Sequence, residues 1–279
     1  MADASSAEPA APAHFRDIAI VGGGCYGTFY AAQLERARAR GKASYRRLLI
    51  VDHDPACRAA SEPGLGVAEL VVEDWGAFFD RWLAGEAGAS DAIVPSPLMP
   101  HLMYEWLLRR ARQRWPGRPV ESRAVEAEAG TPYDLLAPDG TRFASFADWL
   151  CPVHCIEPSI CPVIRAPRTW EMSETLSGMT RRMAPAAAAR DTIVPDPVVF
   201  RCRHRVYGVG MFDAAEVLAG DAAVAEAGAS GARADILVGT VSSCHGAISV
   251  LHLGPDQGSE EPPGVLYSSS QSGRPARPE

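Results

Sequence analysis

Residues 17–27 read DIAIVGGGCYG, and this stretch does the most to predict the fold. The run DIAIV is typical of a buried strand, and the glycines that follow it end the strand. Residues 26–40 then show helical spacing of apolar positions, and Gly41 follows as a helix stop. A strand, a glycine turn and a helix in this order predict the first unit of an α/β sheet.

The chain continues to alternate between strand-like and helix-like segments. We expect further strands at 48–51, 67–72, 91–94 and 119–125. We expect further helices at 76–85 and 98–115. Such alternation predicts a parallel sheet with helices on its faces, because parallel strands need crossover connections. The sequence therefore predicts an α/β domain over residues 15–125.

The pattern changes near residue 126. Residues 133–146 predict a hairpin around Pro-Asp-Gly. Further strands are expected at 197–206 and 235–241, and helices at 171–183 and 212–227. We expect a smaller α+β domain over residues 126–253 with a Cys/His-rich loop. Residues 1–14 and 254–279 are rich in Ala, Pro, Gly and Ser, and we expect both to be disordered tails.

Composition excludes some classes of function. Lys and Arg number 27 against 34 Asp and Glu, and the net charge of −7 argues against a protein that binds nucleic acid. The sequence contains no run of about 18 apolar residues, so it predicts no membrane-spanning helix. The first residues lack the basic and apolar regions of a signal peptide, so we expect a cytoplasmic protein with no membrane partner. Nothing in the composition indicates an oligomeric state.

The glycines fit the pattern G-x-G-x-x-G at Gly22, Gly24 and Gly27. In this pattern the first glycine makes the tight turn, the second lets the backbone approach a pyrophosphate, and the third lets helix and strand pack closely. Asp52 ends the next predicted strand, where a carboxylate takes the ribose 2′-hydroxyl. His53 and Asp54 follow, and no arginine is there for a 2′-phosphate, so the sequence favours NAD over NADP.

These motifs carry a resemblance. Residues 17–125 resemble the Rossmann-type NAD(P)/FAD-binding superfamily, and the stretch DAIVPSPLMPH at 91–101 is similar to a strand end of nicotinamide dehydrogenases. The resemblance implies a Rossmann-like parallel sheet, a bound NAD or FAD, and a position for Pro95 beside that cofactor. The choice between nicotinamide and flavin stays open, and the second half carries no resemblance to a family.

Three of the seven cysteines, Cys151, Cys155 and Cys161, fall within eleven residues around His154, and prolines stiffen the segment. Several thiolates on a stiff loop suit zinc or an iron–sulfur cluster. A further ligand is expected from Cys202 or His204, or from Cys244 and His245, which we favour because they follow an apolar strand. A reversible disulfide, a nucleophilic thiol or ordinary packing are the alternatives.

Together these features predict an NAD(P)- or flavin-dependent oxidoreductase with a metal, iron–sulfur or redox-thiol site in its second domain. Its substrate is expected to be a small molecule, and an anionic one if Arg201, Arg203 and Arg205 share one face of a strand. The alternative is a non-catalytic nucleotide-binding sensor or partner-binding protein with a structural zinc site. The sequence assigns no catalytic residue.

Overall fold

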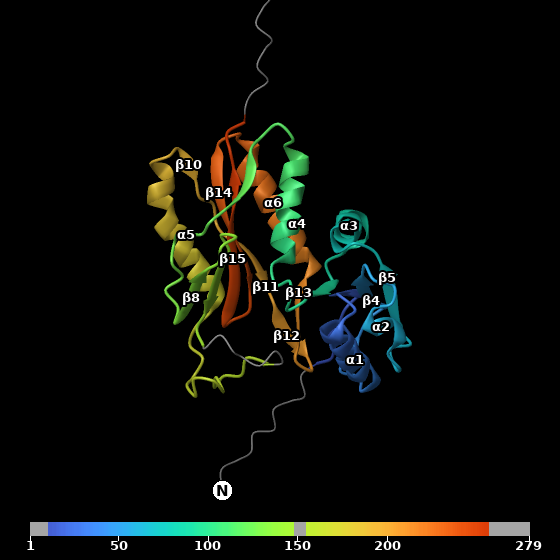
Figure 1. The fold of residues 1–279 in the computed structure, drawn as a ribbon. Coiled ribbons are helices and arrows are strands. Elements are labelled where there is room, and N and C mark those ends of the chain that lie inside the picture. Colours follow the sequence, from blue (N-terminus) through green and yellow to red (C-terminus); the bar gives the residue numbers. More distant parts are fainter. Residues whose placement is uncertain (1–10, 148–154, 257–279) are drawn as a thin grey trace, which may run out of the picture.

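A mixed α/β architecture organises the residues that the computed structural model describes, 11–147 and 155–256 (Figure 1). The strands of these residues form a six-stranded sheet, a seven-stranded sheet and a two-stranded pair. The six-stranded sheet has the order β12-β13-β6-β2-β4-β5, and the seven-stranded sheet is built around the long hairpin of β14 and β15.

Four parallel strands make one side of the six-stranded sheet: β2 (Asp17–Val21), β4 (Arg47–Asp52), β5 (Ala68–Val72) and β6 (Ala92–Val94). Every residue of β2 is buried because helices cover both faces of the sheet. Ile18 and Ile20 pack with α1 (Cys25–Ala39), whereas Ala19 and Val21 share a core with α3 (Trp75–Arg81). The apolar run of β2 therefore reflects burial on both faces of the six-stranded sheet.

The sheet is mixed, which corrects the expectation of a purely parallel one. β12 (Arg203–Val206) and β13 (Val209–Asp213) form an antiparallel hairpin, and β13 pairs antiparallel with β6. The two residues of the turn, Tyr207 and Gly208, have φ of 45° and 75°, as a tight hairpin turn requires. The hairpin covers the edge of β6 that the parallel strands leave open.

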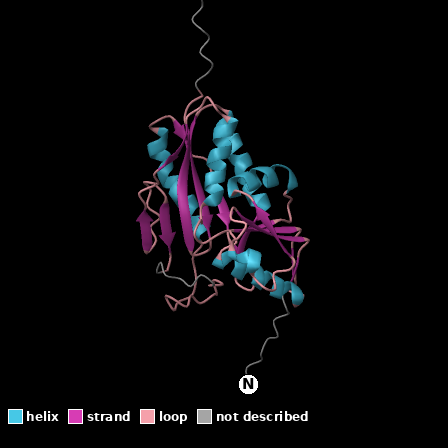
Figure 2. Cartoon of the chain, turned by 45° about the vertical axis from the view of Figure 1, so that its right-hand side comes forward, coloured by secondary structure: helices cyan, strands magenta, loops and turns pink. Residues whose placement is uncertain are grey.

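The seven-stranded sheet is centred on β14 (Arg233–Val241) and β15 (His245–Leu253), which pair along their whole lengths. Helices α4 (Leu102–Arg114) and α6 (Ala214–Ala229) lie on one face of this sheet, and α5 (Met172–Ala188) lies on the other (Figures 1 and 2). Its other strands are β7 (Val120–Arg123), β8 (Tyr133–Leu136), β9 (Arg142–Ser145), β10 (Thr192–Ile193) and β11 (Val198–Arg201).

Several sequence expectations need correction. The strand near 119–125 does not complete the parallel sheet, because β7 pairs antiparallel with β15. The segment 197–206 is two strands in two different sheets, β11 and β12. Residues 13–14, which we placed in a disordered tail, form β1 (Ala13–His14) and pair with β3 (Ala43–Ser44). The helix expected at 76–85 is α3 followed by a π-helical turn, η1 (Trp82–Glu86). The structure also has a short helix after Cys57, α2 (Arg58–Ser61).

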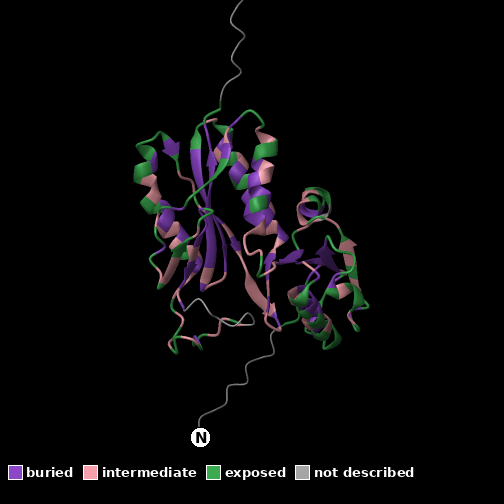
Figure 3. Cartoon of the chain, viewed as in Figure 1, coloured by how far each residue is buried: buried purple, intermediate pink, exposed green. Residues whose placement is uncertain are grey.

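One hydrophobic core joins the two large sheets. Phe78, Trp106, Phe200 and Leu251 all belong to it, and they come from α3, α4, β11 and β15. The buried strands and the inner faces of α4 and α6 are visible together in Figure 3. The separate domains at 15–125 and 126–253 stay a prediction, and most of both proposed tails lies outside the described residues. Among the helices described, none has the length and apolar character needed to cross a membrane.

Candidate functional site

The glycine turn joins β2 to α1. Gly22 has a φ of +86°, which favours glycine, and a Cβ on Gly27 would lie 1.7 Å from the carbonyl oxygen of Gly22. Gly24 is the N-cap of α1, and no atom lies within 4 Å of the position where its Cβ would be. Thr28 N donates the first helical hydrogen bond to Gly24 O, so the N–H groups of the residues before Thr28 face out of the helix end.

Asp52, the last residue of β4, is buried against the glycine turn. Its Oδ2 accepts a hydrogen bond from Gly23 N at 2.6 Å, and its Oδ1 accepts one from Asp54 N at 2.9 Å. The carboxylate therefore holds the turn in place. A carboxylate has about four acceptor positions, so these bonds leave it able to accept from a further hydroxyl.

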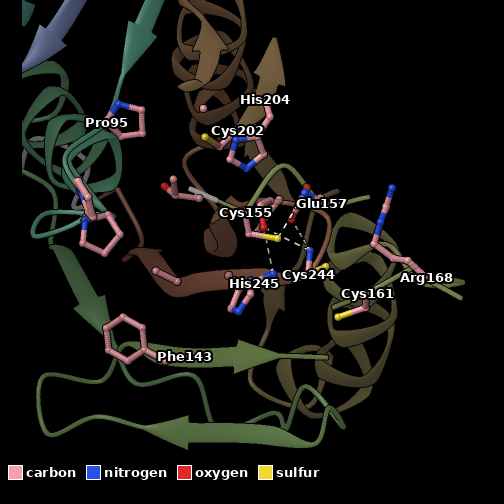
Figure 4. A pocket seen from close by; sticks show the side chains of 18 of the residues that line it. Pro95, Phe143, Cys155, Glu157, Cys161, Arg168, Cys202, His204, Cys244 and His245 are labelled. Atoms are coloured by element: carbon pink, nitrogen blue, oxygen red, sulfur yellow. Dashed lines mark hydrogen bonds between the residues drawn. The ribbon is translucent and has the colours of Figure 1, made fainter. Parts of the chain in front are cut away.

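A cavity of about 350 Å³ opens beyond the carboxyl end of β6. Pro95, Ser96 and Pro97 follow β6 and line one side, and Tyr30 of α1 adds an aromatic ring. The opposite side comes from the end of β14 and the start of β15, and from the segment 155–168 (Figure 4). Because β2 and β6 are parallel, the glycine turn and this cavity lie at the same edge of the sheet.

Four cysteines from three parts of the chain line the cavity, and we call it the thiol cavity: Cys155, Cys161, Cys202 and Cys244. Cys202 lies between β11 and β12, and Cys244 lies in the turn between β14 and β15. His204 and His245 also line it. Cys151 and His154 lie outside the described residues.

The segment after Cys155 is tied down by its backbone. Cys161 N donates to Ala166 O at 2.9 Å, and Arg168 N donates to Ser159 O at 2.8 Å. Glu157 has a positive φ of 52°, an uncommon conformation for a residue with a side chain. Its carboxylate accepts from Ser243 N at 3.2 Å and from Cys244 N at 3.1 Å. Glu157 therefore clamps this segment onto the β14–β15 turn.

The electrostatics of the cavity favour a neutral Cys202, a neutral Cys244 and a charged Glu157. Burial raises the pKa of Cys202 and of Cys244 to about 12. Burial also acts to raise the pKa of Glu157, but hydrogen bonds from Ser242, Ser243 and Cys244 bring it below its ordinary value. Burial lowers the pKa of His245, so this ring is held neutral. Cys202 and Cys244 therefore keep their protons at neutral pH.

His204 faces the thiol cavity beside Cys202 (Figure 4). Its Nδ1 lies 3.0 Å from the carbonyl oxygen of Gly208. Since a carbonyl only accepts, Nδ1 carries the proton, and Nε2 of the neutral ring is an acceptor.

Four of the five predicted metal ligands line one cavity, and the fifth, Cys151, lies outside the described residues. Cys155, Cys161, Cys244 and His245 all line it. Within residues 11–147 and 155–256, however, no three His, Cys, Asp or Glu side chains come together as ligands of one ion would. Cys202, an alternative in the sequence analysis, lines the same cavity.

The predicted anion-binding arginines are placed differently from the expectation. Arg201 ends β11, whereas Arg203 and Arg205 lie on β12, so the three share no strand. Arg203 pairs with Glu216 at 2.7 Å and Arg205 with Asp213 at 2.6 Å. None of them lines the thiol cavity, but Arg168 does. Nothing local in the sequence marks Tyr30 or Phe143 as lining residues, because tertiary packing brings them there.

Comparison with known proteins gives one family. The family model described as "Uncharacterized protein, C-terminal domain" matches residues 103–254, more than half of the chain, so the chain belongs to that family. The match spans all four cysteines of the thiol cavity, and it excludes the glycine turn and Pro95. No curated protein matches the chain, and no solved structure does.

Proposed function

We propose that the protein is an oxidoreductase that uses a nicotinamide or flavin dinucleotide, with the thiol cavity as its active site. The observation that carries this proposal is that the glycine turn and the thiol cavity lie at one edge of the parallel strands. Ligands of α/β sheets bind outside the carboxyl ends of the strands. The order β6-β2-β4-β5 is that of the first four strands of a Rossmann-like sheet.

The glycine turn fits a dinucleotide in three respects. Gly22 makes the turn, Gly24 leaves open space, and Gly27 packs the helix closely on the strand. The exposed N–H groups at the start of α1 suit a pyrophosphate, and the first turn of α1 holds no acidic residue. Residues 52–54 hold no arginine for a 2′-phosphate and two aspartates instead, which supports NAD over NADP.

The cavity supplies the reacting end. Its volume of about 350 Å³ is within the range of small-molecule sites. When bound, the dinucleotide would supply hydride or electrons. The chain itself would exclude water with Pro95, Pro97 and Tyr30, and His204 would accept or return a proton at Nε2. Arg168 is the lining group suited to an anionic substrate.

Titration of the purified chain with NAD, NADP and FAD by calorimetry tests the proposal. The key variant is Gly24→Val, because Gly24 has a φ of −73°, which valine adopts, and no neighbouring atom within 4 Å. The variant should therefore keep the structure of the unchanged protein, but the valine side chain would block the pyrophosphate. We expect at least about tenfold weaker binding, or about 1.4 kcal/mol.

The matched control is Gly117→Val, since Gly117 is also surrounded by open space and lies in the connection between α4 and β7. Its affinity should equal that of the unchanged protein. The proposal is wrong if no dinucleotide binds, or if Gly24→Val binds as well as the control. Tighter binding of NADP than of NAD would reverse the assignment of Asp52.

A further inference from the structure

His101 and Thr240 meet where the segment after β6 crosses the end of β14. His101 lies between β6 and α4 and is the N-cap of α4. Its Nδ1 lies 3.1 Å from Oγ1 of Thr240, a residue of β14. Thr240 lines the thiol cavity, and so does Pro100, the neighbour of His101. The hydrogen bond therefore connects the ring of His101 to a residue of the cavity wall.

The ring of His101 is held in one orientation. It stacks on the ring of Tyr104, with 4.7 Å between the ring centroids and 10° between the ring planes. The hydroxyl of Tyr104 lies 2.6 Å from Ser122 Oγ and 3.1 Å from Val250 O, so the stacking partner is itself fixed. Burial lowers the pKa of His101 to about 3. At neutral pH the ring is therefore neutral and carries one proton, on Nδ1 or on Nε2.

The surroundings of Nε2 indicate which nitrogen carries this proton. Nε2 is buried and has no hydrogen-bond partner among the residues that the structure describes. A proton on Nε2 would be a buried N–H without an acceptor, and such groups are rarer in proteins than unpaired acceptors. The proton therefore belongs on Nδ1, and Nδ1–H donates to Thr240 Oγ1.

This arrangement leaves the hydroxyl hydrogen of Thr240 available. A hydroxyl has one donor hydrogen and two acceptor lone pairs, and His101 uses one of the lone pairs. Within residues 11–147 and 155–256, the hydroxyl of Thr240 makes no second hydrogen bond. Thr240 is buried, and a buried donor without an acceptor is costly. A ligand oxygen in the thiol cavity would supply the missing acceptor.

We propose that Thr240, oriented by His101, donates a hydrogen bond to a carbonyl oxygen on the reacting ring of the dinucleotide. Nicotinamide has such an oxygen on its carboxamide, and the flavin ring has carbonyl oxygens as well. The assignment deepens the proposed function and rests on it. Thr240 is then a binding residue, and His101 is a positioning residue.

The place of His101 in the fold favours the dinucleotide as the source of this oxygen. His101 belongs to the segment that follows β6, and β6 pairs with β2, which leads into the glycine turn. A dinucleotide held at that turn would enter the cavity from the side of this segment. Its ring would therefore come to the wall that carries Thr240.

Calorimetry on the full chain with NAD and with ADP-ribose, which is NAD without its nicotinamide, tests the assignment. Thr240→Val removes the hydroxyl and keeps the branched shape of the side chain. We expect about five- to tenfold weaker binding of NAD, as for the loss of one hydrogen bond. Binding of ADP-ribose should not change, which also shows that the variant is folded. If FAD is the dinucleotide that binds, FAD and ADP replace NAD and ADP-ribose.

Thr240→Ser keeps the hydroxyl and should bind NAD as the unchanged protein does. Thr192→Val is the matched control, because Thr192 is a buried threonine of the same sheet, in β10, and lies outside the cavity. Its affinities for NAD and ADP-ribose should equal those of the unchanged protein.

His101→Leu and His101→Asn test the positioning role. Both variants lose the stacking on Tyr104, so a purely structural role of the ring would affect them alike. The amide of asparagine can donate from the place of Nδ1, whereas leucine has no donor. We expect His101→Leu to weaken NAD binding as Thr240→Val does, and His101→Asn to retain it.

The proton on His101 can be observed without any ligand. In nitrogen NMR of the chain with labelled histidine, the signals of His101 are those that disappear in His101→Asn. We expect a neutral ring at pH 7 with its proton on Nδ1.

Three results would overturn the assignment: a proton on Nε2, an NAD affinity of Thr240→Val equal to that of the control, or an equal loss of NAD and ADP-ribose affinity in Thr240→Val. In each case NAD still binds to the unchanged protein, so the proposed function stands. If no dinucleotide binds to the unchanged protein, the proposed function is wrong, and the role of Thr240 fails with it.

Discussion

Asp17 shows how much one residue at the start of β2 determines. Its side chain is fully buried, and its Oδ2 accepts from Arg46 Nη2 at 2.6 Å and from Arg47 Nη2 at 2.7 Å. Burial by itself raises the pKa of Asp17, but hydrogen bonds from the two arginines bring it down to about 2. The residue therefore fastens the beginning of β4 to the beginning of β2.

The pH dependence of Asp17 follows from this shift. A carboxyl with a folded pKa of about 2 and an unfolded pKa of 3.8 contributes fully above pH 3.8, and its contribution is lost as the pH falls through about 2. Denaturation by urea should show this loss between about pH 4 and pH 2. Asp17→Asn should lower the free energy of unfolding by about 2 kcal/mol at pH 7 and remove this part of the acid dependence.

Asp196→Asn is the control for the acid dependence, since this carboxyl is exposed. Its unfolding should follow that of the unchanged protein over the same pH range. An equal loss in both variants, or no loss in Asp17→Asn, would contradict the assignment of the acid dependence to Asp17.

At the scale of elements, the packing of α1 on β2 depends on Gly27. A Cβ at this position would lie 1.7 Å from Gly22 O and 3.4 Å from Ile20 Cγ2. The nearer atom belongs to the backbone of the glycine turn, which cannot rotate away as a flexible side chain can. The helix would have to move outward, and the glycine turn would move with it.

Gly27→Ala should therefore destabilise the protein by about 1–3 kcal/mol or more, as overpacking does in other cores. Thermal unfolding followed by circular dichroism measures the change. Gly117→Ala, at a position with open space, should stay within about 0.5 kcal/mol of the unchanged protein. Equal stability of the two variants would show that α1 is not held against β2 as the structure has it.

At the scale of the whole molecule, the two large sheets are joined in two ways. The β12–β13 hairpin from the second half of the chain extends the six-stranded sheet at β6. The shared core contains side chains from both sheets, among them Ile93 of β6 and Leu253 of β15. The family match begins at residue 103, within α4, and α4 packs against the seven-stranded sheet.

This shared core predicts a single cooperative unfolding transition. Tryptophan fluorescence and far-ultraviolet circular dichroism should give the same urea midpoint, because Trp82 and Trp106 both lie in the shared core. Two separate transitions, one for each sheet, would contradict this expectation and favour the independent domains predicted from the sequence.

The sequence predicted the structure correctly where residues a few positions apart in the chain determine it. The apolar run at 17–21, the glycine turn and the Pro-Asp-Gly hairpin all form where they were expected. Gly22, Gly24 and Gly27 each have the geometry that their place in the motif predicts, since turn and helix packing depend on residues a few positions apart. Dinucleotide binding by this turn stays a prediction.

Long-range pairing was not predictable in the same way. The strand at 119–125 was assigned to the wrong sheet, and β13 was not expected as a strand at all. A short strand has the same local pattern whichever sheet it joins, because its partner is chosen by burial and by free sheet edges far away in the sequence. The lining of the thiol cavity was not predictable for the same reason, because its residues come from segments far apart in the sequence.

The sequence by itself determined that cysteines and histidines would gather near one stiff segment and that a glycine turn would open a helix. Only the tertiary structure decided that Cys202, Tyr30 and Pro95 face the same cavity as Cys161 and Cys244. The β12–β13 hairpin pairs with β6 while β11 pairs with β14, and the link between these strands carries Cys202 to the point where the two sheets meet. Strand pairing across the chain, rather than spacing along it, therefore assembles the site.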